Sequence, residues 1–155
     1  MHPARHLPRP IAGALLALWA VSAAAAPPLL PGPIRAEVLE VVDGDTLSVR
    51  AMIWLGQVIE TRVRVDGLDT PERRARCPRE KELAEAAHEL TRQLVGNGPV
   101  DLLDVQADKY GGRVRARVRT LDGRDLSQTL IAAGLARPYH GERRQPWCDG
   151  DAGVG

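Results

Sequence analysis

The sequence predicts an α+β fold: a β-barrel of five short strands, with a helix inserted between the third and fourth strands and a short helix at the C-terminal end. Runs in which apolar and polar residues alternate, each bounded by Gly, Pro or Asp, indicate the strands. One longer segment with apolar residues at helical spacing indicates the inserted helix. Five short strands interrupted by a helix fit the OB-fold, a small barrel that closes on itself.

The first three strands are expected at Ile34–Val42, Thr46–Ile53 and Val58–Val65. Trp54–Gln57 joins the second and third strands as a β-hairpin. Because the two ends of a hairpin lie side by side, Asp45 and Asp69 can be neighbours in space although they are far apart in the sequence.

Apolar residues recur on one face of the inserted helix, which is expected at Pro78–Val95. Pro78 suits the first turn of a helix, and Gly96 suits the position after its end. The later elements are expected to be strands at Val100–Val105 and Arg113–Thr120 and a short helix at Leu126–Ala133.

Residues 1–26 are expected to be a secretory signal peptide. Two arginines precede the apolar segment Ile11–Val21, and the small residues Ser22–Ala26 follow it, with cleavage expected within the last three alanines. The apolar segment is shorter than a bilayer-spanning helix requires. Export to the periplasm or the medium of a bacterium, with no membrane association after cleavage, is therefore favoured over a membrane-anchored N-terminus.

The rest of the chain is expected to be one folded domain, residues 34–148, with a flexible lead-in at 27–33 and a disordered tail at 149–155. Because the sequence contains no phenylalanine, the core must consist of Val, Leu, Ile and Ala. We expect the domain to be a monomer.

The net charge does not predict binding to nucleic acid. Removing Arg5 and Arg9 with the signal peptide leaves 19 of the 21 basic residues against 20 acidic residues, a net charge of −1. Any attraction for phosphate must therefore be local.

Cys77 and Cys148 are the two cysteines of the sequence. An even pair in an exported chain indicates a disulfide. Closing a loop of roughly 70 residues would stabilise the fold by about 4 kcal/mol on the chain-entropy model, and it would hold Arg143–Cys148 beside the loop that precedes Cys77. The alternative is a metal site that adds His88 and His140, although these spacings match no zinc-binding pattern.

Two acidic motifs flank the hairpin. The first, Asp43-Gly44-Asp45-Thr46, is by itself typical of a tight turn. The second, Asp69-Thr70-Pro71-Glu72, follows a strand that carries Arg64. Carboxylate oxygens bind hard cations such as Ca²⁺, a further carboxylate can orient or deprotonate water, and arginine binds phosphate oxygens. Together the motifs indicate metal-assisted phosphoryl chemistry.

The motifs continue in order with Asp108-Lys109-Tyr110-Gly111-Gly112-Arg113 and Gly134-Leu135-Ala136. The whole series resembles the thermonuclease (staphylococcal nuclease-like) family, whose members are calcium-dependent phosphodiesterases built on an OB-fold. The resemblance extends from Ile34 to Tyr139 and is not confined to one short motif.

The resemblance implies a role for each matching acidic residue. Asp45 and Asp69 would bind Ca²⁺ through their side chains, and Thr70 would bind it through its backbone carbonyl. Glu72 would be the general base or the group that orients the attacking water. Asp43 would support these ligands from behind, with a turn-forming role as an equal alternative.

By the same resemblance, Arg64 and Arg113 would hold the scissile phosphate and stabilise the charge that develops on it. Gly112 is an extra residue before the second arginine. Either the loop accommodates the extra glycine and Arg113 binds the phosphate, which we favour, or Arg115 partly takes over the role of the second arginine. The later arginines of the same strand face are expected to be solvated.

Three further residues would contact the nucleotide. Lys109 and Tyr110 match the family pattern, with Tyr110 offering a ring and a hydroxyl. Tyr139 lies near, but not at, the position of the family's other base-contacting tyrosine and is included as a further candidate.

The resemblance thus implies an exported Ca²⁺-dependent nuclease that hydrolyses DNA, RNA or both and leaves a 3′-phosphate and a 5′-hydroxyl. Two alternatives come from other classes: a non-catalytic OB-fold that binds single strands, and a structural calcium-binding module. The full set of carboxylates argues against the first. The pairing of Glu72 with Arg64 argues against the second, because a structural calcium site needs no arginine.

Overall fold

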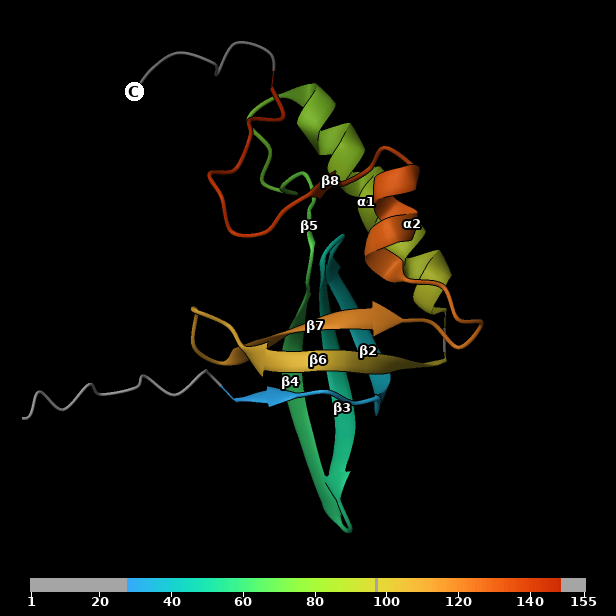
Figure 1. Cartoon of the computed structure of the whole chain (residues 1–155). Coiled ribbons are helices and arrows are strands. Elements are labelled where there is room, and N and C mark those ends of the chain that lie inside the picture. The colour runs from blue at the N-terminus through green and yellow to red at the C-terminus, as the bar shows by residue number, and fades with distance from the viewer. Residues whose placement is uncertain (1–27, 97, 149–155) are drawn as a thin grey trace, which may run out of the picture.

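The computed structural model describes residues 28–96 and 98–148 and contains the predicted closed barrel. Its strands follow the order β6-β2-β3-β4-β7, and pairing between β7 and β6 closes it (Figure 1). The strands are β2 Ile34–Asp43, β3 Thr46–Trp54, β4 Gln57–Val65, β6 Pro99–Ala107 and β7 Arg113–Arg119. All neighbouring pairs in the barrel are antiparallel except β4 and β7, which run parallel. The predicted OB-fold barrel is confirmed.

Both predicted helices are present: α1 spans Pro78–Val95 and α2 spans Leu126–Ala132. Proline occupies the first turn of α1 and Gly96 ends it, as the sequence predicts. The helices lie together at one end of the barrel, beside the short strand pair β5 (Leu68–Asp69) and β8 (Arg137–Pro138) (Figure 1).

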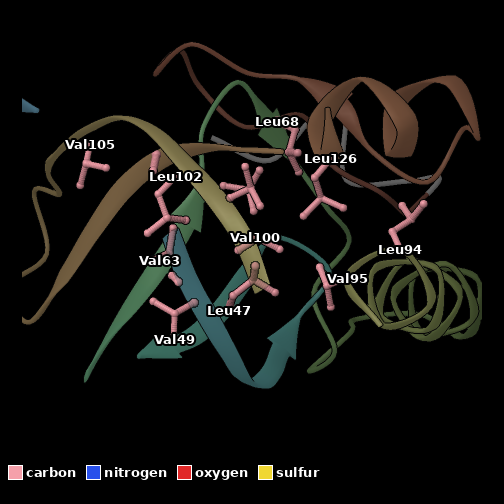
Figure 2. Packing of buried hydrophobic residues seen from close by; sticks show 14 of the residues in the cluster. Leu47, Val49, Val63, Leu68, Leu94, Val95, Val100, Leu102, Val105 and Leu126 are labelled. Carbon is pink, nitrogen blue, oxygen red and sulfur yellow. The ribbon is translucent and has the colours of Figure 1, made fainter. Parts of the chain in front are cut away.

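Alternation along the strands places one set of side chains inside the barrel. In β3, Leu47, Val49 and Ala51 are buried, whereas Arg50 between them is exposed. The core consists of valine, leucine and alanine side chains, as expected of a sequence without phenylalanine (Figure 2). Its largest fully buried apolar residues are Leu47, Leu68, Leu126, Leu130, Val49, Val63, Val65, Val100 and Val118.

The β3–β4 hairpin extends beyond the barrel on the side away from the helices (Figure 1). Its tip is apolar and solvent-exposed: Trp54 is 73% exposed and Leu55 is 87% exposed. The opposite end of the same hairpin, where Thr46 pairs with Arg64, lies toward the helices. The two acidic motifs are therefore found at the helix end of the barrel.

Part of the lead-in expected at residues 27–33 forms a strand. Leu29–Leu30 form a short strand, β1, that pairs with Val105 and Gln106 of β6. Asp104 has a φ of 52°, in the left-handed region, and the register of β6 shifts around it. β6 thus pairs with β2 up to Leu102 and with β1 beyond Asp104.

The expected signal peptide, residues 1–26, and the expected disordered tail, residues 149–155, lie outside the described residues. Within the described part of the chain, neither helix has the length and apolar character needed to cross a membrane.

Replacing Leu47 by alanine should destabilise the barrel, because a buried Leu→Ala change costs about 2–5 kcal/mol of unfolding free energy. Urea denaturation followed by circular dichroism measures this loss. Leu55→Ala is the matched control at an exposed position, and we expect a change below about 0.5 kcal/mol. A loss at Leu47 no larger than the loss at Leu55 would contradict the assignment of Leu47 to the core.

Candidate active site

The turn between β2 and β3 carries Asp45, and α1 holds that turn in place. A Cβ atom on Gly44 would lie 2.9 Å from the Cβ of Ala87 on α1, so glycine allows the turn to approach the helix without displacement. The hydroxyl of Thr91 donates a hydrogen bond of 2.8 Å to the carbonyl of Gly44. The helix therefore fixes Asp45 from behind.

Arg64 joins the two ends of the hairpin. Its Nη1 donates to Asp45 Oδ2 at 2.7 Å, and its Nη2 lies 3.8 Å from Asp69 Oδ1. The backbone N–H of Val65 donates to the carbonyl of Asp45 at 2.8 Å. Asp45 and Asp69 are only 5% and 3% exposed. The structure thus brings two buried carboxylates to one arginine, as hairpin geometry predicts.

Glu72 lies in the loop between β5 and α1, and Glu80 holds that loop. Glu80 is only 6% exposed and lies in the first turn of α1. Its carboxylate accepts hydrogen bonds from the backbone N–H groups of Glu72, at 3.3 Å, and Arg76, at 3.0 Å. Sequence analysis missed this residue. An acidic residue three positions after the N-cap, Cys77, is the signal that could have found it.

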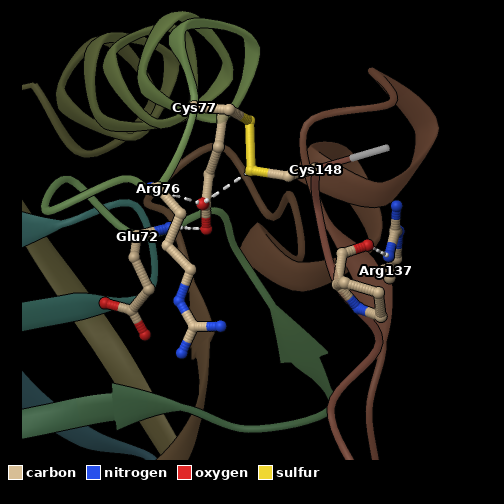
Figure 3. Close-up of a disulfide and its surroundings, with 7 residues drawn as sticks. Glu72, Arg76, Cys77, Arg137 and Cys148 are labelled. Atoms are coloured by element: carbon tan, nitrogen blue, oxygen red, sulfur yellow. Dashed lines mark hydrogen bonds between the residues drawn. A yellow bond between two sulfur atoms is a disulfide. The ribbon is translucent and has the colours of Figure 1, made fainter. Parts of the chain in front are cut away.

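The C-terminal tail returns to the same loop. A disulfide joins Cys148 to Cys77 at the start of α1, as predicted (Figure 3). The guanidinium of Arg137 lies 3.8 Å from the ring centroid of Trp147 and donates to the carbonyl of Pro146 at 3.0 Å. The tail is therefore attached covalently at its end and by side-chain contacts just before it.

The alternative metal site is not formed. Cys77 and Cys148 are bonded to each other. His88, expected on the helix surface, is half-buried with Nε2 2.9 Å from the carbonyl of Val41. His140 uses its backbone N–H to bond a nearby glutamate. The two sulfur atoms and the ring of His88 therefore have partners of their own.

The guanidinium of Arg144 contacts two of the predicted metal ligands, Asp69 and Thr70. Sequence analysis missed this contact. Arg144 Nη2 is 2.6 Å from Asp69 Oδ1 and donates to the carbonyl of Thr70 at 3.2 Å. Its Nη1 donates to Glu72 Oε1. Burial lowers the pKa of Arg144, but the hydrogen bond to Glu72 and the negative charges of Asp69 and Glu72 outweigh burial and keep the pKa above its ordinary range. A charged guanidinium therefore touches three predicted site residues.

Asp69 Oδ1 is a buried carboxylate oxygen that accepts no hydrogen bond. Arg144 Nη2 is close enough to donate one but is not aligned with it, and Arg64 Nη2 lies farther away. A buried charged oxygen without a hydrogen bond costs free energy, and a hard cation would satisfy it. The carboxylates of Asp69 and Asp45, which share Arg64, and the carbonyl of Thr70 are oxygen ligands of the kind that Ca²⁺ prefers.

Asp43 shares the electrostatic environment of these carboxylates. Burial raises its pKa, and the charges of Asp45 and Glu72 raise it further, while Arg73 and His88 act in the opposite direction. Asp43 is thus close enough to the site to feel its charges.

The second predicted arginine lies in a separate cluster. Arg113 Nε donates to Asp108, and the guanidinium lies 5.0 Å from the ring centroid of Tyr110, with Lys109 Nζ 5.2 Å from the same centroid. Gly112 has a φ of 80° and lies in the turn before β7. Among the described residues, no hydrogen bond or ion pair joins Arg113 to the carboxylates that Arg64 contacts.

The other arginines of β7 also have aspartate partners. Arg115, the alternative phosphate ligand, lies across from Arg64 in the β4–β7 pairing, and its Nη1 is 3.5 Å from Asp66 Oδ1. The two later pairs are Arg117–Asp104 at 2.7 Å and Arg119–Asp101 at 3.8 Å. The arginines on this face are therefore paired, and Arg117 and Arg119 are also partly solvated, as expected.

Tyr139 follows β8, and its backbone N–H donates to the carbonyl of Gly67 at 3.1 Å. With Asp69 and Arg137 it lines a pocket of about 190 Å³ that the tail helps to form. The structure thus places Tyr139 in the same pocket as Asp69, and Tyr110 beside Arg113.

Comparison with known families tests the resemblance directly. Residues 62–149, more than half of the chain, match the family described as Staphylococcal nuclease homologue. The chain belongs to this family. Most of the candidate residues fall within the part of the chain that matches the staphylococcal nuclease homologue family, whereas Asp43 and Asp45 precede it.

Two similar proteins, from Escherichia coli and Escherichia coli O157:H7, are each named uncharacterized endonuclease. Each is 27% identical to this chain over 119 residues, which cover 77% of this chain and 70% of the relative. This similarity extends beyond the region that matches the staphylococcal nuclease homologue family.

Asp43→Asn should stabilise the metal-free protein at neutral pH. Because the pKa of Asp43 is raised in the folded state, its contribution to stability is fully present below the ordinary value of 3.8 and is lost as the pH rises through the raised pKa. The gain from asparagine should therefore appear at pH 7 and vanish near pH 3. Urea denaturation in EDTA at both pH values measures it.

Asp122→Asn is the control with the opposite sign. Hydrogen bonds from Arg124 and Thr120 lower the pKa of Asp122 to about 2, so its contribution is present above 3.8 and is lost as the pH falls through the folded-state pKa. Asparagine at this position should destabilise the protein at pH 7. Changes of the same sign in the two variants would contradict the assignment at Asp43.

Proposed function

We propose that the protein is an exported, monomeric, Ca²⁺-dependent nuclease that hydrolyses phosphodiester bonds of DNA, RNA or both. The observation that carries this proposal is the meeting of two buried aspartates, the Thr70 carbonyl and Glu72 with arginine side chains at one end of the barrel. Membership of the staphylococcal nuclease homologue family and the endonuclease names of the relatives support a nuclease. The disulfide supports export, because disulfides persist in oxidising compartments.

Asp45 and Asp69 would hold the cation through their carboxylates, and Thr70 would hold it through its backbone carbonyl. A bound Ca²⁺ would stabilise negative charge on the phosphate as the reaction proceeds. The raised pKa of Asp43 supports its placement behind these ligands, close to their charges.

Glu72 would take the proton from the attacking water, or orient that water. Its side chain is 54% exposed, while Glu80 holds its backbone, so the carboxylate is positioned and still reaches solvent. The water oxygen bonds to phosphorus, the bond to the 5′-oxygen breaks, and that oxygen takes up a proton from solvent. The products are a 3′-phosphate and a 5′-hydroxyl.

Arg64 and Arg113 would bind the phosphate oxygens, since a guanidinium binds phosphate through two parallel hydrogen bonds. Arg113 would exchange Asp108 for the phosphate, and Arg115 is the alternative. Lys109 and Tyr110, which lie beside Arg113, would contact the nucleotide on that side.

Tyr139 is the candidate contact on the other side, because it lines the same pocket as Asp69. Its ring would offer a stacking surface for a base.

The first test is digestion of single-stranded DNA by the oxidised mature protein. Cleavage is expected with Ca²⁺ and should be abolished by EGTA. Glu72→Gln and Arg64→Ala should each lower the rate by roughly 10²- to 10⁴-fold, because each removes a group that acts on the reacting atoms. Glu82→Gln, at an exposed position of α1, is the matched control and should retain the wild-type rate.

Near-wild-type rates in either site variant, with an unchanged circular dichroism spectrum, would contradict the assigned roles. Binding without cleavage at every divalent cation tried would favour the non-catalytic OB-fold protein that binds single strands.

Alanine substitution along β7 tests the second arginine. Arg113→Ala should lower the rate of DNA cleavage by roughly 10²-fold or more, whereas Arg117→Ala, which removes a partly solvated ion pair with Asp104, should leave it unchanged. A large loss in Arg115→Ala with little loss in Arg113→Ala would assign the role to Arg115.

A further inference from the structure

Two contacts of the C-terminal tail, a disulfide and a hydrogen bond, keep Arg144 at the candidate metal site. The disulfide joins Cys148 to Cys77, at the start of α1 and directly after the loop that carries Glu72 (Figure 3). Trp147 Nε1 lies 3.4 Å from Asp69 Oδ2 and donates to it. The tail therefore reaches the site in a fixed position.

The guanidinium of Arg144 and a bound cation would need the same oxygens. Arg144 Nη2 lies 2.6 Å from Asp69 Oδ1 and 3.2 Å from the carbonyl oxygen of Thr70. Ca²⁺ lies about 2.3–2.6 Å from its oxygen ligands. A cation on these two oxygens would consequently occupy nearly the same place as the nitrogen, and two positive charges repel each other there.

The contact of Arg144 is suited to displacement, in contrast to that of Arg64. Arg144 lies near Asp69 Oδ1 but leaves that oxygen without an aligned hydrogen bond, and its side chain is 42% exposed, with solvent on one side. The side chain of Arg64 is only 17% exposed and donates to both Asp45 and the carbonyl of Leu68. Arg64 is thus fixed, whereas Arg144 can turn outward.

We propose that Arg144 is a tethered competitor of the divalent cation and sets the affinity of this site for Ca²⁺. Without the cation, the guanidinium neutralises Asp69 and Glu72; when the cation binds, Arg144 leaves Asp69 and the Thr70 carbonyl. The disulfide keeps Arg144 at a high effective concentration beside these ligands. This inference rests on the proposed function, because it concerns the same cation site.

The test is isothermal titration calorimetry, in which Ca²⁺ is added to the oxidised, metal-free mature protein and the Kd is measured. Arg144→Gln should lower the Kd for Ca²⁺ roughly tenfold, because the competing state is removed. Arg144→Lys should lower it by less, since lysine keeps the charge but cannot bridge several oxygens as a planar fork does. Arg143→Gln, the matched control on the adjacent tail residue, should leave the Kd within about twofold.

A Kd in Arg144→Gln that equals or exceeds the wild-type value would overturn the proposal. An equal decrease in Arg143→Gln, with no change in Arg144→Lys, would also overturn it, because that pattern reports only the loss of a nearby positive charge.

Reduction of the disulfide supplies a second readout on the same chain. With the tether opened, the Kd of the wild-type protein should fall toward that of Arg144→Gln, and the Kd of Arg144→Gln itself should not change. Circular dichroism checks that the reduced protein remains folded; if it unfolds, the oxidised variants alone decide. A wild-type Kd that does not change on reduction, in a folded protein, would contradict the role of the tether.

The two levels of the proposal fail in different ways. If neither the wild-type protein nor any variant binds Ca²⁺ or cleaves DNA, the proposed function is wrong and this inference falls with it. If the wild-type protein binds Ca²⁺ and cleaves DNA, but the Arg144 variants bind Ca²⁺ with the same Kd, only the competition is wrong.

Discussion

Charge repulsion among the carboxylates at the helix end of the barrel is the constraint on which the surrounding structure depends. Burial is the main cause of the raised pKa of Asp43, and repulsion from Asp45 and Glu72 raises that pKa further. Arg64 offsets it from within the barrel by pairing with Asp45, and Arg144 offsets it from the tail by pairing with Asp69. Each pair joins residues that are distant in the sequence. The hairpin brings Arg64 to Asp45, and the disulfide-linked tail brings Arg144 to Asp69. The pairing at Asp45 therefore requires the closed barrel, and the pairing of Arg144 with Asp69 requires the attached tail.

Much of the fold could be predicted because its signals are local. Alternation fixes which side chains of β3 and β4 face inward, and proline and glycine mark the ends of α1, whose observed bounds, Pro78–Val95, are those predicted. The pairing of Asp45 and Asp69 with Arg64 was also predictable, since a hairpin must bring its two ends together.

The remainder depends on contacts that no local pattern fixes. Arg144 and Glu72 are 72 positions apart, and the sequence does not show which tail arginine meets which carboxylate. Glu80 belongs to a helix by its periodicity, but its bonds to the preceding loop require the loop to fold back. The β1 strand could not be foreseen either, because it has only two residues and its partner, β6, is distant in the sequence.

Ion pairing between arginine and aspartate also explains how a domain with a net charge near zero could bind a nucleic acid. The arginines of β7 are each paired with an aspartate: Arg113–Asp108, Arg115–Asp66, Arg117–Asp104 and Arg119–Asp101. Exposed ion pairs contribute only about 0–1 kcal/mol, so a phosphate can replace the aspartate of Arg115 or Arg117 at little cost. At Arg113 the exchange costs more, because it leaves the buried carboxylate of Asp108 without its partner. Arg144 presents the mirror case, in which a cation would replace a guanidinium on carboxylates. The phosphate of the substrate would then replace an aspartate, and the cation would replace a guanidinium. Because each incoming group replaces one of the same charge, binding requires no surplus of positive charge on the domain.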